Sequence, residues 1–213
     1  AQVLLAVMSG MYAVWHGPEG LRAIATRTAR LASALARGLK GLGLEVPGAG
    51  AFDTIRVDGT AAQADAWVDG AKSRGMNLRR LSATTITIAF DETTTAADVV
   101  ALLDVFRGGK PVPAIDALVR ESEPQIPEAL RRTSAYLQHP VWNTHHAEHE
   151  MLRYIRKLER KDLSLTKSMI PLGSCTMKLN ATAEMMPITW PEWAGLHPFA
   201  PVEQAQGYAR IFK

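Results

Sequence analysis

The spacing of hydrophobic positions in the first 45 residues predicts two helices in succession. Residues 1–15 are almost wholly apolar, which is typical of a buried helix. His16-Gly17-Pro18 interrupts this helix, and Pro18 suits the first turn of a second one. The second helix, predicted to end at Gly41 or Gly43, has arginines on its solvent-facing side. Its apolar arc comprises Leu21, Ile24, Ala25, Leu31, Ala32, Leu35, Leu39 and Leu42.

Beyond residue 50 the pattern predicts three short strands, with a helix between the first two. The strands are expected at residues 52–57, 77–81 and 84–90, and the helix at 61–74. Thr95 and Asp98 match a capping box, which predicts a last helix running to Phe106. This order of elements indicates a small α+β domain with helices on a mostly antiparallel sheet.

Two carboxylates, Asp91 and Glu92, lie just before the last of these helices. They could be catalytic, but short polar residues before a helix are also typical of N-terminal capping. We interpret them as residues of the helix start.

Glycine and proline mark a boundary near residue 108, where Gly108-Gly109-Lys110-Pro111 follows the last helix. We therefore divide the chain into a domain over 1–108, a linker with short helical pieces over 109–138, and a third region over 139–213. In the third region a charged helix is predicted over 150–161, followed by aromatic segments broken by proline. The apolar residues predicted to face inward from this helix are Met151, Leu152, Ile155 and Leu158.

The composition narrows the classes of protein to consider. The 213 residues carry a net charge of +3 with the basic residues spread out, so neither nucleic acid nor a membrane is an expected partner. One cysteine excludes an intramolecular disulfide and fits a reducing compartment. The apolar N-terminal stretch is too short to span a membrane and has no basic region. Because the sequence starts inside a helical pattern and without methionine, we expect a fragment of a longer protein.

The densest group of polar chemistry follows Gly173. It contains two hydroxyls, the single thiol, an ammonium and a carboxamide, from Ser174, Cys175, Thr176, Lys178 and Asn180. A glycine followed by small polar residues lets backbone N–H groups and hydroxyls converge on an anion such as a carboxylate or phosphate. Considered by residue chemistry alone, a polar surface turn explains the segment at least as well, because no fixed spacing rule supports a site.

A second motif, His145-His146-Ala147-Glu148-His149, matches the H-x-x-E-H pattern of inverted zinc metalloproteases. His145 and His149 would share one helical face, and Glu148 could activate a zinc-bound water. The pattern also needs a third ligand from a downstream helix, and no downstream glutamate has a supporting pattern. We therefore expect neither a metal site nor proteolysis.

Ordered matches to one known family run over nearly the whole chain and are strongest from Met169 to Asn180. The other matching stretches are residues 12–21, 52–54, 91–95, 139–141, 151–154, 158–163, 183–192, 196–199 and 207–208. Together they resemble the P-protein family of the glycine cleavage system, whose members are pyridoxal-phosphate-dependent glycine decarboxylases. Long ordered matches of this kind are far more specific than either short motif.

The resemblance implies a family chain built of two tandem aminotransferase-like halves, and hence an α/β fold. Residues 1–108 would be the small α+β domain of the N-terminal half. Residues 109–138 would be the linker, and 139–213 the opening arm of the C-terminal half, whose pyridoxal phosphate (PLP) domain would be missing. The Schiff-base lysine of the family follows a histidine, and no His-Lys pair occurs here. Lys178 is therefore not given that role, and no catalytic residue is expected in this fragment.

The chain departs from the family pattern at the zinc-like motif. His145, Ala147 and His149 stand where the family usually has an aromatic residue, a serine and a threonine. The motif is therefore interpreted as variation within a helix start, which loses the hydroxyl that serine would provide for capping.

The resemblance also implies the reaction: PLP-dependent decarboxylation of glycine, with transfer of the aminomethyl group to the lipoyl arm of the H-protein. The PLP ring takes up the electrons left by departing CO₂. Candidates for the wall of the substrate or cofactor pocket are Ser174, Cys175, Thr176, Asn180 and His197. Cys175 could instead be a buried, inert thiol, and His197 a structural cap before Pro198.

Two alternatives to this function stay open. The first is another aminotransferase-like PLP enzyme, and the second is a non-catalytic dimerisation or arm module. The isolated fragment is expected to be inactive. We expect the whole protein to be a homodimer or a two-subunit assembly, in the cytoplasm of a bacterium or the mitochondrial matrix of a eukaryote.

Overall fold

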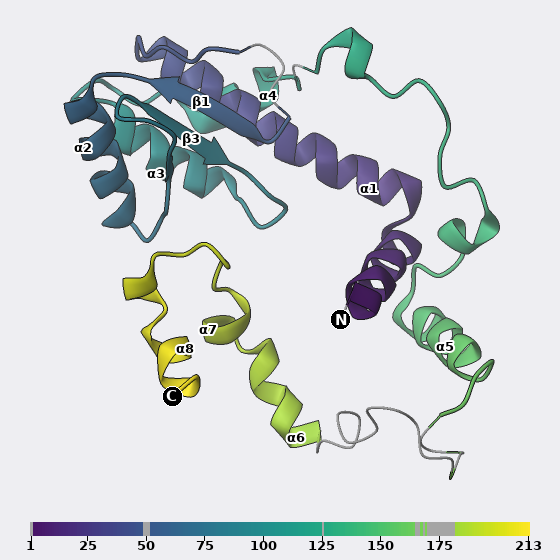
Figure 1. Cartoon of the computed structure of the whole chain (residues 1–213). Helices are drawn as coiled ribbons and strands as arrows, with labels where there is room; N and C mark the ends of the chain where they lie inside the picture. The colour runs from purple at the N-terminus through teal and green to yellow at the C-terminus, as the bar shows by residue number, and fades with distance from the viewer. Residues whose placement is uncertain (1, 49–51, 125, 165–166, 168, 170–181) are drawn as a thin grey trace. The chain divides into compact units, whose positions relative to one another are not determined.

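The computed structural model describes residues 2–48, 52–124, 126–164, 167, 169 and 182–213 (Figure 1). The chain separates into two compact units, Ala1–Ile155 and Arg156–Lys213, which we describe one at a time. Among the described helices, none is both long enough and apolar enough to cross a membrane.

Helix α1 (Gln2–Gly41) is bent at Gly17, whose φ of 61° and ψ of −179° are not helical (Figure 1). A Cβ at this position would lie 2.6 Å from the carbonyl oxygen of Trp142, so glycine is required for space as well as for conformation. The predicted break at residues 16–18 and the predicted end at Gly41 are both confirmed.

Three strands form the sheet: β1 (Thr54–Asp58), β2 (Arg79–Arg80) and β3 (Thr85–Ala89). Their order is β1-β3-β2, and both pairings are antiparallel. Ile55 lies opposite Ile88 and Val57 opposite Ile86, and all four side chains are buried. One face of the sheet therefore belongs to the core, as the alternating pattern predicted.

Helices α2 (Ala61–Lys72) and α3 (Ala96–Phe106) complete this core together with α1. Both begin with a capping box, in which Thr60 pairs with Gln63 and Thr95 with Asp98. The buried core includes Leu35, Leu39, Trp67, Leu103 and Phe106. The predicted helix–strand–helix–strand–strand–helix order is confirmed.

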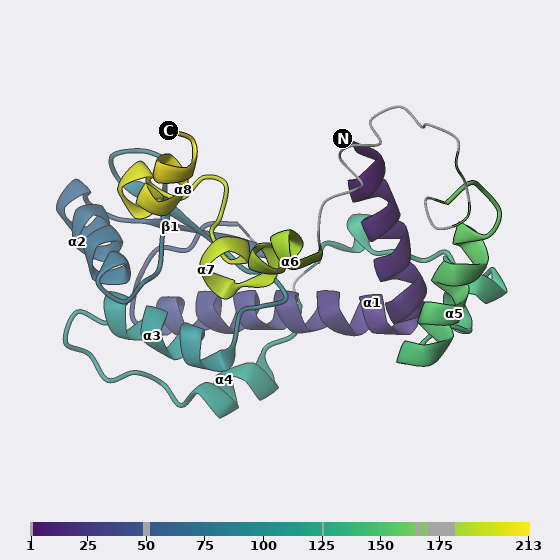
Figure 2. The same cartoon turned by 90° about the horizontal axis from the view of Figure 1, so that it is seen from below.

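The described residues of 109–147 form one α-helix and two 3₁₀ helices. Helix α4 (Ile115–Glu121) packs on α1 and α3, as Figure 2 shows, and its Leu118 is buried beside Leu103 and Gly38. The 3₁₀ helices are η1 (Glu128–Leu130) and η2 (Pro140–Asn143). The short helical pieces expected after residue 108 are thus present, and the first of them is part of the core.

Helix α5 (Glu148–Glu159) has no buried residue. Leu152 and Ile155 are 59% and 43% exposed, so the prediction that these two face inward is wrong, whereas Met151 and Leu158 are half-buried. The spacing was that of an amphipathic helix, and the side that carries Leu152 and Ile155 stays open to solvent.

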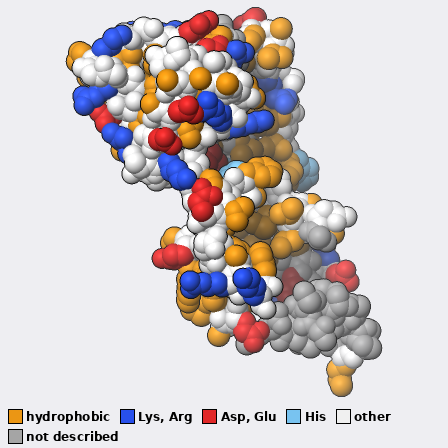
Figure 3. Space-filling model, turned by 60° about the vertical axis from the view of Figure 1, so that its left-hand side comes forward, with side chains coloured by type: hydrophobic (Ala, Val, Ile, Leu, Met, Phe, Trp, Pro, Cys, Tyr) orange, Lys and Arg blue, Asp and Glu red, His pale blue; other side chains and the backbone are white. Residues whose placement is uncertain are grey.

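The second unit is built of short helices: α6 (Thr182–Met185), η4 (Met186–Thr189), α7 (Pro191–Ala194), η5 (Val202–Gln204) and α8 (Gln206–Ile211). Tyr208 of α8 donates a hydrogen bond to the carbonyl of Trp193 (2.8 Å), and the two rings meet edge to face. Many apolar residues of the second unit are open to solvent, among them Phe199 and Phe212. Figure 3 shows hydrophobic side chains at the surface of the chain on the face in view.

A small antiparallel sheet with helices on its buried face is a mixed helix-and-strand architecture, compatible with the predicted α/β class. The aminotransferase-like fold and the domain bounds at residues 108 and 138 stay predictions.

Candidate functional site

Four of the five predicted pocket residues, Ser174, Cys175, Thr176 and Asn180, lie outside the described residues, as does Lys178. The fifth, His197, is exposed in the second unit. Its Nδ1 accepts a hydrogen bond from the backbone N–H of Phe199 (3.0 Å), and its carbonyl accepts one from Ala200 (2.9 Å). These bonds fit the structural-cap alternative and leave a role at a pocket as a prediction.

The zinc-like motif does not have the helical geometry assumed for it. Helix α5 begins at Glu148, so His145 precedes the helix and does not share a helical face with His149. The His145 ring instead stacks on Tyr154, with centroids 4.3 Å apart and planes 13° apart. In the part of the chain that the structure describes, no three His, Cys, Asp or Glu residues are placed to hold a metal.

His146, next to this motif, holds the bend in α1. Its Nδ1 lies 2.6 Å from the carbonyl oxygen of Trp15, and because a carbonyl only accepts, Nδ1 is the protonated donor. On the other side of the bend, Tyr136 donates to the carbonyl of Pro18 (2.7 Å). A Cβ at Gly17 would lie 2.9 Å from Cε1 of His146, so the absent side chain of Gly17 makes room for the His146 ring. The sequence predicted the break in α1 but gave no signal that His146 and Tyr136 bond to the residues beside it.

Asp91 lies in the loop before α3, as the helix-start interpretation predicted, but the N-cap of α3 is Thr95. Asp91 Oδ1 accepts hydrogen bonds from the hydroxyl (2.6 Å) and the backbone N–H (2.9 Å) of Thr93. These bonds, with further ones from Thr94, hold the pKa of Asp91 below its usual value. Arg27 of α1 ties down the same loop through the carbonyls of Glu92 (3.0 Å) and Thr94 (2.6 Å). This carboxylate is thus engaged in holding the loop.

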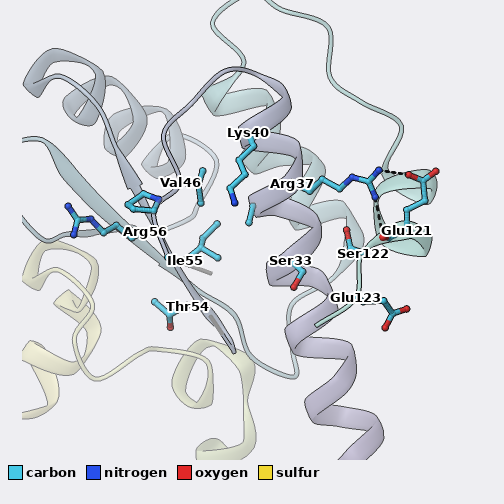
Figure 4. A pocket seen from close by; sticks show the side chains of 13 residues that line it. Ser33, Arg37, Lys40, Val46, Thr54, Ile55, Arg56, Glu121, Ser122 and Glu123 are labelled. Atoms are coloured by element: carbon cyan, nitrogen blue, oxygen red, sulfur yellow. Dashed lines mark hydrogen bonds and ion pairs between the residues drawn. The ribbon is translucent and has the colours of Figure 1, made fainter. Parts of the chain in front are cut away.

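The first unit contains a cavity of about 540 Å³ between α1, β1 and the segment after α4 (Figure 4). Its polar lining is Ser33, Arg37, Lys40, Thr54, Arg56, Glu121, Ser122 and Glu123. Its apolar lining is Ala36, Val46, Pro47 and Ile55, next to Gly48. The helical pattern placed Arg37 and Lys40 on a solvent-facing side, and only the packing of α4 and β1 makes that side a cavity wall.

Two of the three cations in this lining already have partners. Arg37 bonds to the Glu121 carboxylate (2.6 Å) and carbonyl (3.1 Å), and Figure 4 shows it pointing to that residue. Arg56 pairs with Asp58 at 2.8 Å, which raises the pKa of Arg56 above its usual value. Together with a hydrogen bond from Thr85, the pair lowers the pKa of Asp58.

Lys40 is the third cation. Figure 4 shows its ammonium reaching into the space beside Ile55 and Val46. It has no hydrogen bond or ion pair with any described residue. A cavity that combines a free ammonium, hydroxyls and apolar walls can receive a small anion with an apolar body.

The family model of the glycine cleavage system P-protein matches residues 1–106 of the chain. A pea protein named mitochondrial glycine dehydrogenase (decarboxylating) is 59% identical over 213 residues, which is 100% of this chain and 20% of the pea protein.

Two further relatives are similar to the chain over nearly its whole length. A bacterial glycine dehydrogenase (decarboxylating) from Cupriavidus metallidurans is 56% identical over 211 residues, covering 99% of this chain and 22% of the relative. The mitochondrial glycine dehydrogenase (decarboxylating) 1 of Arabidopsis thaliana is 55% identical over 215 aligned positions, which cover 100% of this chain and 20% of the relative. The chain therefore spans about a fifth of the length of the curated relatives it matches.

Proposed function

The chain belongs to the glycine cleavage system P-protein family, and from that premise we propose that it is a segment of an enzyme that decarboxylates glycine. The observation that carries the proposal is an identity of 55–59% over at least 99% of the chain to proteins named for this activity. At that identity the matches run through both units, and not only through the part that the family model covers.

The segment's own contribution is structural. In the proposed organisation, residues 1–108 are the small domain of the first of two aminotransferase-like halves, 109–138 the linker and 139–213 the opening arm of the second half. The antiparallel sheet and its helices, which form a core within the chain, support the first of these assignments.

The cofactor of the proposed enzyme is PLP, which supplies an electron sink for the pair left by CO₂. The cavity lined by Lys40 does not fit a PLP site. Lys40 lines the cavity of the first unit, but no aromatic side chain lines it to stack on a pyridine ring, and the residue before Lys40 is Leu39 rather than a histidine. We therefore assign no step of the reaction to these residues and place the Schiff-base lysine outside this chain.

The substrate is glycine, and the acceptor of the aminomethyl group is the lipoyl disulfide of the H-protein. Ser174, Cys175, Thr176 and Asn180 remain the candidates for contacting the glycine carboxylate or the cofactor phosphate. The assembly remains a homodimer or two-subunit enzyme. By the same analogy it acts in a bacterial cytoplasm or in mitochondria, the compartment in the names of the plant relatives.

Exchange of labelled bicarbonate into the carboxyl group of glycine tests the proposal. We expect the longer protein that contains this segment to catalyse it when PLP and lipoylated H-protein are present. We also expect visible absorbance from lysine-bound PLP. The absence of both exchange and absorbance would show that the protein is not this enzyme. Absorbance without exchange, together with amino-group transfer to a 2-oxo acid, would identify a different aminotransferase-like enzyme.

The fragment itself provides a second test. Mixed with PLP and borohydride, the 213-residue chain should acquire no covalent pyridoxyl group at Lys178. Peptide mass spectrometry that located the group on Lys178 would overturn the assignment of the cofactor lysine to another part of the protein.

A further inference from the structure

We propose that the cavity of about 540 Å³ in the first unit is a recognition site for one carboxylate or phosphate group on a short apolar body. The proposal rests on polar groups that line the cavity and have no partner among the described residues. It is independent of the decarboxylation reaction.

Three hydrogen-bond donors line the cavity without an acceptor from any described residue. They are the ammonium of Lys40 and the hydroxyls of Ser33 and Ser122. Ser122 is the most informative, because it is only 4% exposed and its Oγ is a buried polar atom that lacks a hydrogen bond. Buried hydroxyls are normally paired, so an unpaired one beside a cavity points to a partner that binds there.

The nearby carboxylates do not supply that partner. Glu121 is bound by Arg37 at 2.6 Å, and Glu123 lies 3.5 Å from Arg30. The residues that follow Gly48 in the sequence, Ala49-Gly50-Ala51, have no carboxylate. The cationic donor Lys40 is therefore left for an anion from outside the described chain.

The remaining lining specifies the body of the ligand. Ala36, Val46, Pro47 and Ile55 present hydrocarbon beside the ammonium of Lys40. Figure 4 shows Lys40 lying along this side of the cavity, with Arg37 turned away from it. A short aliphatic chain bearing one anionic group satisfies both kinds of lining, whereas a polyanion would be repelled by Glu121 and Glu123, which also line the cavity.

The same chemistry could come from a free small molecule or from an acidic side chain elsewhere in the longer protein. The test uses that longer protein, with butyrate and inorganic phosphate as probes in isothermal titration calorimetry. For a free ligand we expect saturable binding of at least one probe, and Lys40→Met should weaken it by about tenfold or more, as the loss of a charge-assisted hydrogen bond predicts. Lys157→Met is the matched control, since Lys157 also lies exposed in the last turn of a helix, and binding should not change.

Ser122→Ala tests whether the hydroxyl of Ser122 contacts the ligand or has a structural role only. Without probe, removing an unpaired buried hydroxyl should raise the melting temperature. With probe, the same variant should bind several-fold more weakly. A variant that raises the melting temperature and leaves probe binding unchanged would remove Ser122 from the site.

If an acidic side chain of the longer protein occupies the cavity, neither probe binds to the wild type. In that case Lys40→Met and Ser122→Ala both lower the melting temperature, and Lys157→Met does not. The proposal is overturned if neither probe binds and Lys40→Met shifts the melting temperature no more than Lys157→Met.

Discussion

The two halves of helix α1 differ in a way that runs against their composition. Residues 2–15 carry no charged side chain, yet within this range Val14 is the single buried residue, and Val3, Leu4 and Leu5 are 66–68% exposed. Residues 18–41 include four arginines and a lysine, and yet Leu31, Leu35 and Leu39 are among the most buried residues of the chain.

The difference shows that burial depends on a partner surface as well as on hydrophobicity. The second half of α1 is apolar on one side only, and the sheet and α3 in the same chain cover that side. The first half is apolar all round, which is typical of a helix enclosed on every side. Because the chain spans about a fifth of its relatives' length, we expect residues outside it to enclose this half.

The largest expected effect is on the local free energy of opening, measured by native-state hydrogen exchange in the longer protein. One leucine from each half of α1 is replaced by alanine. Leu35→Ala should lower the local free energy of opening by about 2–5 kcal/mol, because Leu35 is fully buried. Leu4→Ala should cost more than about 1 kcal/mol if the first half is enclosed, as we expect. A loss of less than about 0.5 kcal/mol for Leu4→Ala would mean that the first half stays exposed in the whole protein. The two halves of α1 would then differ in burial there as well.

A smaller effect is expected where the two halves meet. Gly17→Ala places a Cβ 2.6 Å from the carbonyl oxygen of Trp142, in a backbone conformation that only glycine adopts readily. We expect a loss of about 1–3 kcal/mol from backbone strain, together with a displaced η2. Faster exchange of residues 136–146 would be its signature. Gly41→Ala is the control, because a Cβ there meets nothing within 4 Å, and it should leave these residues unchanged.

The smallest effect concerns the loop that Arg27 ties to the second half of α1. Hydrogen bonds from Thr93 and Thr94 lower the pKa of Asp91, so the folded state favours its carboxylate form. Its contribution to stability is therefore complete above the unfolded pKa of about 4 and is lost as the pH falls through the lower folded value.

Thermal melts between about pH 5 and pH 3 measure this contribution. Over that range the wild type should lose more stability than Asp91→Asn, whose side chain does not titrate. Asp116→Asn, an exposed acid in the first turn of α4, should follow the wild type. Parallel curves for wild type and Asp91→Asn would mean that these hydrogen bonds favour neither protonation state.

Most of the helices and strands of the first unit were predictable, since the signals for them are local. The capping box of Thr95 and Asp98 and the break before Pro18 need only neighbouring residues, and both are present. The family resemblance was also available from ordered matches and is confirmed by the comparisons. The inward positions of Leu152 and Ile155 on α5 were predicted wrongly, since periodicity says which residues share a face but does not say what covers it.

The sequence by itself determined the element order of the first unit, the bend in α1 and the family, because periodicity, capping and ordered matches are properties of the chain. The tertiary structure alone decided what the arginines of α1 do. Arg22, Arg27 and Arg37 are exposed, as predicted, and Arg30 is half-buried. Arg27 bonds to carbonyls 65 and 67 residues away, and Arg37 bonds to Glu121, 84 residues away. It also decided that Lys40 and Ser122 line one cavity. Side chains so distant in sequence come together only when the helices pack, and no local pattern records that geometry.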